Sequence, residues 1–336
     1  MCIRDRLWYP AEPKGDLAPY IRPAEARPFF AYEARIRTNS FQDAPVAARA
    51  NHDPPFPVIL FNPMWGGSRT QDTFLTEDLA SHGYVVVAID HPGNAARVEY
   101  ADGHVATSTM AQAIADENAS SPAQYQATWN KELAVWTQDN EFTLRVLAAA
   151  NQDPGSWLHD ALDLEHVGAL GHSFGGSAAL RLLGLQPAAE TPTVRSAVNM
   201  DGWTLGGLAD RTSQPALFLY GVEATAQMDA LATGSTPQDE LSRVDRTLVN
   251  TSLQRYGGSR AFLLGAEHLD FTDQTLISPI RLFTHTGPLE GRRKRTIVRA
   301  VILAFFDQTL KGSGSLPTFP ELHWFPAATL PAPTRE

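Results

Sequence analysis

The sequence Gly171-His172-Ser173-Phe174-Gly175 constrains the fold more than any other feature of this chain. It stands between an apolar run, His166 to Leu170, and a stretch rich in Ala and Leu, residues 174–186, that is typical of a helix. A strand that turns sharply into a helix needs glycines on both sides of the turn, because a Cβ atom there would strike the neighbouring backbone. The pattern therefore predicts a strand, a tight turn that presents the Ser173 hydroxyl, and a helix whose positive N-terminal end lies beside that hydroxyl.

Apolar runs and helical patterns alternate along the rest of the chain. This order predicts an α/β fold with a mostly parallel central sheet and helices on both faces. The predicted strands are 57–61, 84–89, 166–170, 194–200, 216–220 and 260–264, and the predicted helices are about 70–82, 139–151, 174–186 and 293–310. Leu7 to Tyr9 and Tyr32 to Arg37 are also strand-like and would add an antiparallel edge.

We expect a single domain over residues 1–311. Residues 91–138 contain more polar and small residues than a core element would, so they are expected to form an excursion over the sheet. Residues 312–336 are rich in Pro, Gly and Ser, and they are expected to form an extended tail.

The composition argues against several classes of function. The formal net charge of -10 provides no surplus of cations for gripping phosphates, so nucleic acid is not expected as a partner. Cys2 is the only cysteine and the ten histidines show no metal-ligand spacing, so no metal and no cofactor are expected. No apolar stretch approaches the roughly 20 residues that span a bilayer, so integral association with a membrane is not expected. No signal-type apolar region precedes Leu7, which is compatible with a cytoplasmic protein or with an export signal missing from this chain. The oligomeric state is left open.

A serine nucleophile needs a base, and histidine has a suitable ordinary pKa of about 6.5. In folds with a strand-turn-helix nucleophile, the histidine follows the last core strand. His268 meets this condition, since it ends the loop Gly265-Ala266-Glu267-His268 that leaves the strand 260–264. His82 and His91 precede Ser173 in the chain and are expected to be structural. His172 is expected to be buried beside Ser173, and His285 comes too late in the chain order.

Two residues are compatible with the acid that would orient this histidine. Asp201 ends the strand 194–200 and precedes Gly202, which allows the chain to turn toward the nucleophile. Glu223 follows the next strand, where many proteins of this fold carry their acid. The residues alone leave both open.

Several short segments, taken together, resemble one known family, the plasma-type platelet-activating factor acetylhydrolases and their bacterial relatives, which belong to the α/β-hydrolase superfamily. The resemblance spans nearly all of the chain except its tail. The segments are Leu7-Trp8-Tyr9-Pro10, 78–84 (DLASHGY), Asp90-His91-Pro92-Gly93-Asn94, 162–164 (LDL) leading into 171–176 (GHSFGG), Asn199-Met200-Asp201-Gly202, and His268-Leu269-Asp270-Phe271.

The resemblance implies an α/β-hydrolase fold and a serine esterase with the triad Ser173, His268 and Asp201, because the family's acid sits on the strand after the nucleophile helix. It also implies an oxyanion hole formed by the backbone N–H groups of Phe174 and Trp65. The loop that carries Trp65 reads Asn62-Pro63-Met64-Trp65-Gly66-Gly67, where relatives commonly have Ser-His-Gly.

The expected substrate is a small-molecule or lipid-like carboxylic ester with a short acyl chain, since apolar side chains would surround the nucleophile. These wall residues are Met64, Trp65, Phe174, Trp203 and Phe271. Two alternatives remain open: a polyester hydrolase or cutinase-like enzyme, and a catalytically silent binding protein on the same fold. The basic run Arg292-Arg293-Lys294-Arg295 is compatible with contact to anionic lipid or, more commonly for such a run, with a solvated helix face.

Overall fold

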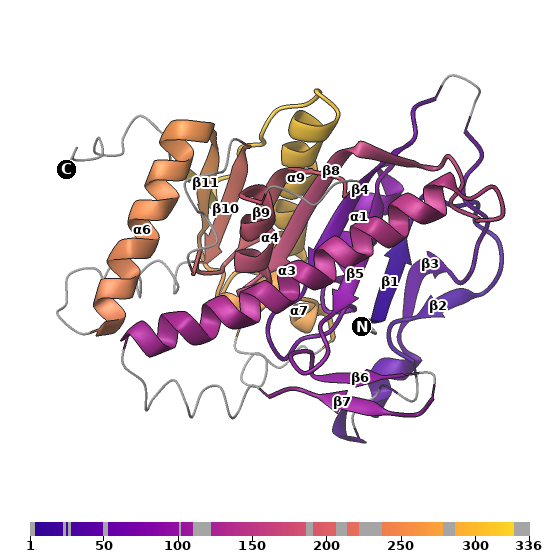
Figure 1. Ribbon diagram of the computed structural model, residues 1–336, viewed down its shortest axis with the longest axis horizontal. Helices are drawn as coiled ribbons and strands as arrows, with labels where there is room; N and C mark the ends of the chain where they lie inside the picture. Colours follow the sequence, from indigo (N-terminus) through magenta and orange to yellow (C-terminus); the bar gives the residue numbers. More distant parts are fainter. Residues whose placement is uncertain are drawn as a thin grey trace.

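The computed structural model describes residues 4–22, 25, 28–49, 53–100, 102–109, 122–185, 191–205, 214–221, 237–277 and 286–325. The main-sheet strands are β1 (Arg4–Trp8), β4 (Phe56–Asn62), β5 (Val85–Asp90), β8 (Leu162–His172), β9 (Val194–Met200), β10 (Ala216–Gly221), β11 (Gly258–Leu263) and β12 (Leu322–Phe325). Within these residues they form an eight-stranded sheet in the order β1-β5-β4-β8-β9-β10-β11-β12 (Figure 1). The inner pairs are parallel, whereas the edge strands β1 and β12 are antiparallel to their neighbours.

Helices cover both faces of this sheet. One face carries α1 (Thr73–Ser81) and α9 (Gly291–Leu310), and the other carries α3 (Pro122–Gln152), α4 (Phe174–Leu183) and α6 (Pro237–Tyr256). In Figure 1, α3 crosses the sheet diagonally. Successive residues of β4 serve the two faces in turn: Ile59 and Phe61 pack in the cluster with α1 and α9, and Val58 and Leu60 in the cluster with α3, α4 and α6. Burial on both faces explains why the inner strands are continuously apolar in sequence.

The smaller elements lie outside the main sheet. They are the hairpin of β2 (Leu17–Pro19) and β3 (Arg37–Phe41), the hairpin of β6 (Arg97–Glu99) and β7 (Val105–Thr107), the 3-10 helices η2 (Pro28–Arg35) and η3 (His268–Phe271), and the short helix α7 (Gln274–Ile277). Among the described residues, no helix combines the length and apolarity needed to cross a membrane.

The predicted α/β class is confirmed, and each of the six predicted inner strands is present. The antiparallel edge predicted from Leu7 to Tyr9 is confirmed as β1, which pairs with β5. The prediction of a strand over Tyr32 to Arg37 is wrong. A 3-10 helix occupies Pro28–Arg35 and β3 begins only at Arg37; Pro28 stands at the first position of this helix, where the fixed φ of proline suits a helix start.

Two other segments differ from the sequence expectation. The expected excursion 91–138 includes the first half of α3, because Leu133 and Trp136 belong to a helical stripe that is buried against α4. The expected tail 312–336 includes β12, which extends the sheet by pairing with β11. The helix α6 was not predicted at all; it is polar apart from a narrow stripe that buries Val249 and Leu253.

The packing of α9 on β8 yields a stability prediction. The ring of Phe306 occupies the space beside Gly168, where an added Cβ would lie 2.6 Å from that ring. Phe306 is fully buried, so Phe306→Ala should lower the free energy of unfolding by about 3–5 kcal/mol. Urea denaturation measures this change. The matched control is Val146→Ala on the exposed face of α3, which should change the value by less than about 0.5 kcal/mol; equal losses would contradict this account of the packing.

Candidate active site

The turn from β8 into α4 brings backbone atoms unusually close together. Ser173 has φ 56° and ψ -124°, a backbone conformation that few residues other than glycine adopt. A Cβ on Gly171 would overlap the carbonyl of Gly175, and a Cβ on Gly175 would overlap the carbonyls of Asn62 and Pro63. The Ser173 hydroxyl makes no capping hydrogen bond to α4. The predicted sharp turn is therefore present, and it holds the Ser173 side chain at the carboxyl edge of the sheet.

Asp201 reaches the same edge from the end of β9. The Ser173 N–H donates to the Met200 carbonyl over 2.9 Å, which ties the Ser173 turn to the residue before Asp201. Asp201 itself has φ 51°, and the side-chain amide of Asn199 closes the turn by donating to Gly202 O (2.8 Å) and accepting from Gly202 N–H (2.9 Å). This turn directs the Asp201 carboxylate back toward the sheet edge.

His268 and Asp201 form a direct pair. His268 Nδ1 lies 2.7 Å from Asp201 Oδ2, and the other carboxylate oxygen accepts a hydrogen bond of 2.7 Å from the Gly221 N–H. The Asp201 side chain is completely buried, whereas the His268 side chain is 43% exposed. A buried carboxylate with both oxygens occupied can orient an imidazole whose other nitrogen faces the open side of the site. Glu223, the other candidate acid, lies outside the described residues.

A buried ion pair supports the turn that carries His268. Lys294 of α9 contacts Asp270, and both side chains are almost fully buried. The second oxygen of Asp270 accepts hydrogen bonds from the Glu267 N–H (2.8 Å) and the Gly287 N–H (2.7 Å). These contacts tie η3, which begins at His268, to α9 and to the segment that contains Gly287.

His172 connects the Ser173 turn to the His268 loop. Its Nε2–H donates to the His268 carbonyl over 2.9 Å, and its Nδ1 lies 3.0 Å from the side-chain amide nitrogen of Gln71. Burial lowers the pKa of His172 well below the ordinary histidine value, so the ring is neutral and can accept at Nδ1. No hydrogen bond joins Ser173 Oγ to His268 within the described residues; the side chain of His172, which precedes Ser173, provides the link to His268.

The loop after β4 lies directly against the start of α4. The Met64 N–H donates to the Gln71 side-chain oxygen (3.1 Å) and the Gly66 N–H donates to the Asn94 carbonyl (2.8 Å). Trp65 lies between Met64 and Gly66, whose N–H groups are both hydrogen-bonded. The Trp65 N–H has no acceptor among the described residues. The Phe174 N–H, in the first turn of α4, likewise has none in that part of the chain, as expected for a helix N-terminus.

The predicted wall residues divide between two environments. The rings of Trp65 and Phe174 are 4.9 Å apart and pack under Trp129 and Trp136 of α3, in a mostly buried aromatic cluster. Phe271 does not line a pocket: it is 0% exposed and lies in the core beneath His172. Trp203 is half-buried.

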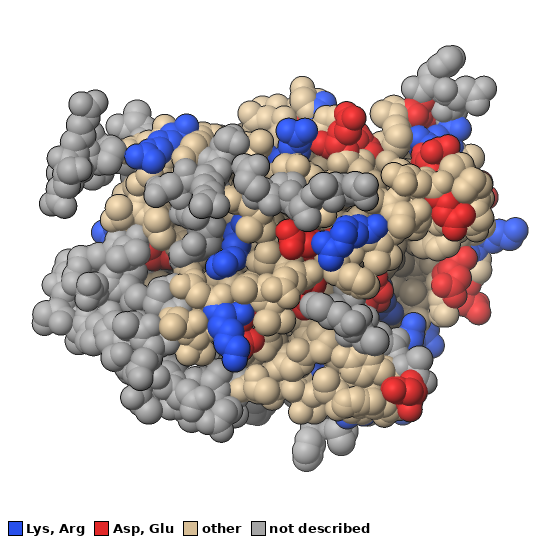
Figure 2. Space-filling view, viewed as in Figure 1, with Lys and Arg blue, Asp and Glu red and all other residues tan. Residues whose placement is uncertain are grey.

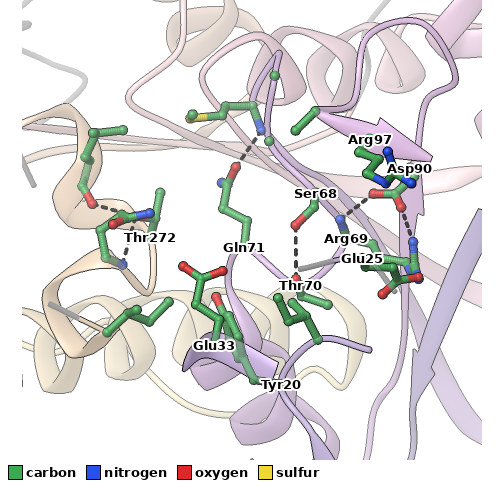
Figure 3. Close-up of a pocket in the computed structure, with 18 residues that line it drawn as sticks. Tyr20, Glu25, Glu33, Ser68, Arg69, Thr70, Gln71, Asp90, Arg97 and Thr272 are labelled. Atoms are coloured by element: carbon green, nitrogen blue, oxygen red, sulfur yellow. Dashed lines mark hydrogen bonds and ion pairs between the residues drawn. The ribbon is translucent and has the colours of Figure 1, made fainter. Parts of the chain in front are cut away.

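Met64 lines a cavity of about 180 Å³ between the loop after β4, η2 and the segment after His268 (Figure 3). The cavity is polar on one side: Ser68 and Thr70 hydrogen-bond to each other over 3.0 Å, and Arg69 pairs with Glu25 and Asp90. Leu269, next to His268 in sequence, lines it as well. The cavity thus adjoins the loop that carries Trp65.

The basic run at the start of α9 is not a continuous cationic surface. Lys294 is buried against Asp270, and Arg293 forms two hydrogen bonds with Glu321 (2.9 and 2.8 Å). Figure 2 shows basic and acidic side chains interspersed over the face that it views. Among the described residues, no group of three or more His, Cys, Asp and Glu side chains is arranged to hold a metal ion.

Sequence reasoning missed four side chains around the site: Gln71, Asn94, Trp129 and Trp136. The aromatic pair was detectable, because Trp129, Leu133 and Trp136 follow the i, i+4, i+7 spacing of one helix face. Asn94 was noted only as part of a motif, although its carbonyl holds Gly66 and its side chain accepts from Trp136 Nε1. Gln71 carried no sequence signal, since its partners come from three separate segments. His91 is buried as expected, with Nδ1 2.8 Å from Asp139.

A parallel sheet with a glycine-flanked serine turn, an acid after the next strand and a histidine after the last parallel strand defines an α/β-hydrolase fold. A solved ferulic acid esterase from Streptomyces cinnamoneus has the same fold, with a TM-score of 0.69 and 24% identity over 96% of this chain and 89% of that chain. The chain belongs to the family described as platelet-activating factor acetylhydrolase, isoform II, which matches residues 5–313.

Two curated proteins are similar to parts of the chain. A probable 1-alkyl-2-acetylglycerophosphocholine esterase from Arthroderma benhamiae is 28% identical over 150 residues, which are 45% of this chain and 32% of that protein. A platelet-activating factor acetylhydrolase from Canis lupus familiaris is 26% identical over 181 residues, 49% of this chain and 39% of that protein. The matches therefore span less than half of either relative.

The buried, neutral His172 predicts a pH dependence of stability. Its pKa is depressed in the folded state, so below the unfolded-state value of about 6.5 the unfolded chain binds the extra proton and stability is lost as the pH falls. His172→Gln removes this titrating group. Relative to the variant, the wild type should lose up to about 1.4 kcal/mol for each pH unit below about 6.5. Urea unfolding of both proteins between pH 7.5 and pH 5 measures this, and parallel curves would contradict it.

Proposed function

We propose that this protein is a serine esterase that hydrolyses carboxylic esters through an acyl-enzyme intermediate, with Ser173 as nucleophile, His268 as general base and Asp201 as the orienting acid. The observation that carries the proposal is the 2.7 Å contact between His268 Nδ1 and the buried Asp201 carboxylate, at the sheet edge where the strained Ser173 turn ends. Family membership supports the same activity.

In the first half of the reaction, Ser173 Oγ attacks the ester carbonyl and His268 Nε2 takes the hydroxyl proton. His268 then gives this proton to the leaving alcohol as the tetrahedral intermediate collapses to the acyl-enzyme. In the second half, a water molecule attacks the acyl carbonyl, His268 takes its proton, and Ser173 leaves with that proton as the acid is released. Asp201 holds Nδ1–H throughout, so Nε2 stays free to accept.

The negative charge of both tetrahedral intermediates develops on the former carbonyl oxygen. We assign its two donors to the N–H groups of Trp65 and Phe174, because neither has an acceptor among the described residues and their neighbours Met64 and Gly66 are already hydrogen-bonded. Loss of one such donor typically raises the barrier by about 2.7–4 kcal/mol. The N-terminal end of α4 adds positive potential at the same place.

Short acyl groups fit this site better than long ones. α3 packs over Trp65 and Phe174, so the two assigned donors stand beside mostly buried aromatic rings that leave the acyl side of the site enclosed. The names of both curated relatives refer to an acetyl ester. Rates on p-nitrophenyl esters should therefore fall steeply as the acyl chain lengthens. Comparable turnover of solid polyester would instead favour the polyester hydrolase hypothesis.

The triad proposal predicts that Ser173→Ala and His268→Ala each reduce turnover of p-nitrophenyl acetate to the low residual level that binding and the oxyanion hole alone support. The double variant should be no slower than either single one, since the residues act as a unit. Wild-type protein should react with a fluorophosphonate probe and Ser173→Ala should not. An unlabelled wild type would indicate a silent binding protein, and near-normal turnover by Ser173→Ala would refute the nucleophile assignment.

The acid assignment predicts opposite results for two isosteric changes. Asp201→Asn should lower kcat by a factor on the order of 10⁴, because an amide that donates to Nδ1 holds His268 in the tautomer that cannot accept the serine proton. Glu223→Gln should leave kcat within about threefold, as expected for a residue outside the reacting unit. Both variants are measured with one soluble ester. If Glu223→Gln loses most of its kcat while Asp201→Asn keeps nearly the wild-type kcat, the orienting acid is Glu223 and the esterase proposal still holds.

A further inference from the structure

We propose that Gln71 is a positioning residue. It holds the loop 62–67, which carries the Trp65 N–H and is called the oxyanion loop below, at a fixed separation from the catalytic histidine His268. This inference rests on the proposed function, because it concerns the geometry of that same site. Gln71 is 9% exposed and lies behind the loop after β4, at the wall of the cavity in Figure 3. Gln71 is not one of the groups assigned to the reaction, so its effect passes through the two segments that it joins.

The first contact of Gln71 is with the oxyanion loop. Its side-chain oxygen accepts the Met64 N–H over 3.1 Å, which is the dashed line from Gln71 to a backbone nitrogen in Figure 3. The chain makes room for this contact at Gly67, where an added Cβ would overlap the Gln71 oxygen. The hydrogen bond fixes the peptide that precedes Trp65, and the Trp65 N–H is the donor assigned to the oxyanion.

The second contact of Gln71 leads to the catalytic histidine. Its side-chain nitrogen lies 3.0 Å from His172 Nδ1, and His172 Nε2 lies 2.9 Å from the His268 carbonyl. Since the neutral His172 ring has one proton, donation from Gln71 to Nδ1 leaves that proton on Nε2, where it is donated to His268 O. One amide and one imidazole thus connect the oxyanion loop to the backbone of His268.

The orientation of the Gln71 amide is set by its partners. Met64 offers an N–H, which requires the amide oxygen on that side. On the other side, Asp72 Oδ2 accepts from the amide nitrogen over 2.9 Å and His172 Nδ1 accepts its second hydrogen. A rotated amide would place the NH₂ group against the Met64 N–H, so only one orientation satisfies all three partners.

The main chain of Gln71 is attached to the same histidine segment. The Asp273 N–H donates to Gln71 O over 2.9 Å, and the Asp273 carboxylate accepts from the N–H groups of Thr73 (2.8 Å) and Phe74 (3.3 Å) at the start of α1. The backbone of Gln71 is therefore hydrogen-bonded to the segment 268–273 and moves with it. The separation between the Trp65 N–H and His268 is consequently determined by the length of one glutamine side chain.

The test compares three substitutions. Gln71→Met keeps the side-chain length and removes all three side-chain hydrogen bonds, including those to Met64 and His172 that make the link. Gln71→Asn keeps an amide but is one methylene shorter, so it can reach only one of the two partners, and it serves if the Met variant does not fold. The matched control is Gln274→Met, which removes an amide from another residue that lines the same cavity and whose side chain makes no hydrogen bond within the described residues.

Two readouts separate positioning from general loss of structure. Steady-state kinetics with p-nitrophenyl acetate give kcat and KM, normalised to the active-site concentration from a fluorophosphonate titration. Inhibition by an aryl trifluoromethyl ketone gives Ki for a tetrahedral adduct, which uses both the oxyanion hole and His268. A misplacement of about 1 Å can cost roughly 10²-fold in rate, so the Gln71 variants should lose roughly 10- to 100-fold in kcat with KM within about twofold. Their Ki values should rise by the same factor.

The control should retain kcat and Ki within about twofold of the wild type. The inference is overturned if a folded Gln71 variant keeps wild-type kcat, if its loss appears only in KM, or if Gln274→Met loses as much. Ser173→Ala is assayed alongside. If the wild type is no faster than Ser173→Ala, the proposed function fails and this inference with it; if the wild type is active and the Gln71 variants match it, only the role of Gln71 fails.

Discussion

The close approach of α4 to the carboxyl ends of β4 and β8 is the constraint on which the rest of the site depends. Without side chains at Gly171 and Gly175, the first turn of α4 rests on the carbonyls of Asn62 and Pro63, and Ser173 is forced to φ 56°. That contact places Ser173, the proposed nucleophile, beside the N-terminal end of α4 and the loop carrying Trp65. Strain of this kind costs on the order of 1–3 kcal/mol and persists only where surrounding packing determines it; here the buried clusters on both faces supply that packing.

Around this contact, buried polar groups hold the elements that carry Asp201 and His268. Asp270 is paired with Lys294 beneath η3, and Asp201 is saturated by His268 and the Gly221 N–H. Such groups are costly when unpaired in a low-dielectric interior, so each has few alternative arrangements. With Nδ1 held by Asp201, Nε2 is the nitrogen of His268 left for proton transfer in the proposed reaction.

Much of the fold was predictable because its signals are local. The inner strands are apolar over their whole length since both faces are buried, and the glycine-flanked serine follows directly from the backbone geometry of the turn. The exceptions depend on distant partners. β12 is only four residues long and forms because β11 offers an unpaired edge. The amino-terminal half of α3 is held by the stripe of Trp129, Leu133 and Trp136, whose partners Trp65 and Phe174 come from distant segments. The 3-10 helix at Pro28–Arg35 replaced a strand predicted from apolar and aromatic residues that suit either state.

By itself the sequence determined the α/β class, the sharp strand-to-helix turn at Ser173 and His268 as the candidate base, because these depend on chain order and on residue types that only particular backbone conformations admit. The residues left both Asp201 and Glu223 open as the acid, and only the family resemblance favoured Asp201. The tertiary structure decided which side chains surround the site. It placed Phe271 in the core, brought Trp136 over Phe174, and joined Gln71 to both Met64 and His172. The physical reason is that hydrogen bonds and ring contacts are short-range interactions between groups far apart in sequence, and their partners are defined only once the sheet has aligned the ends of its strands.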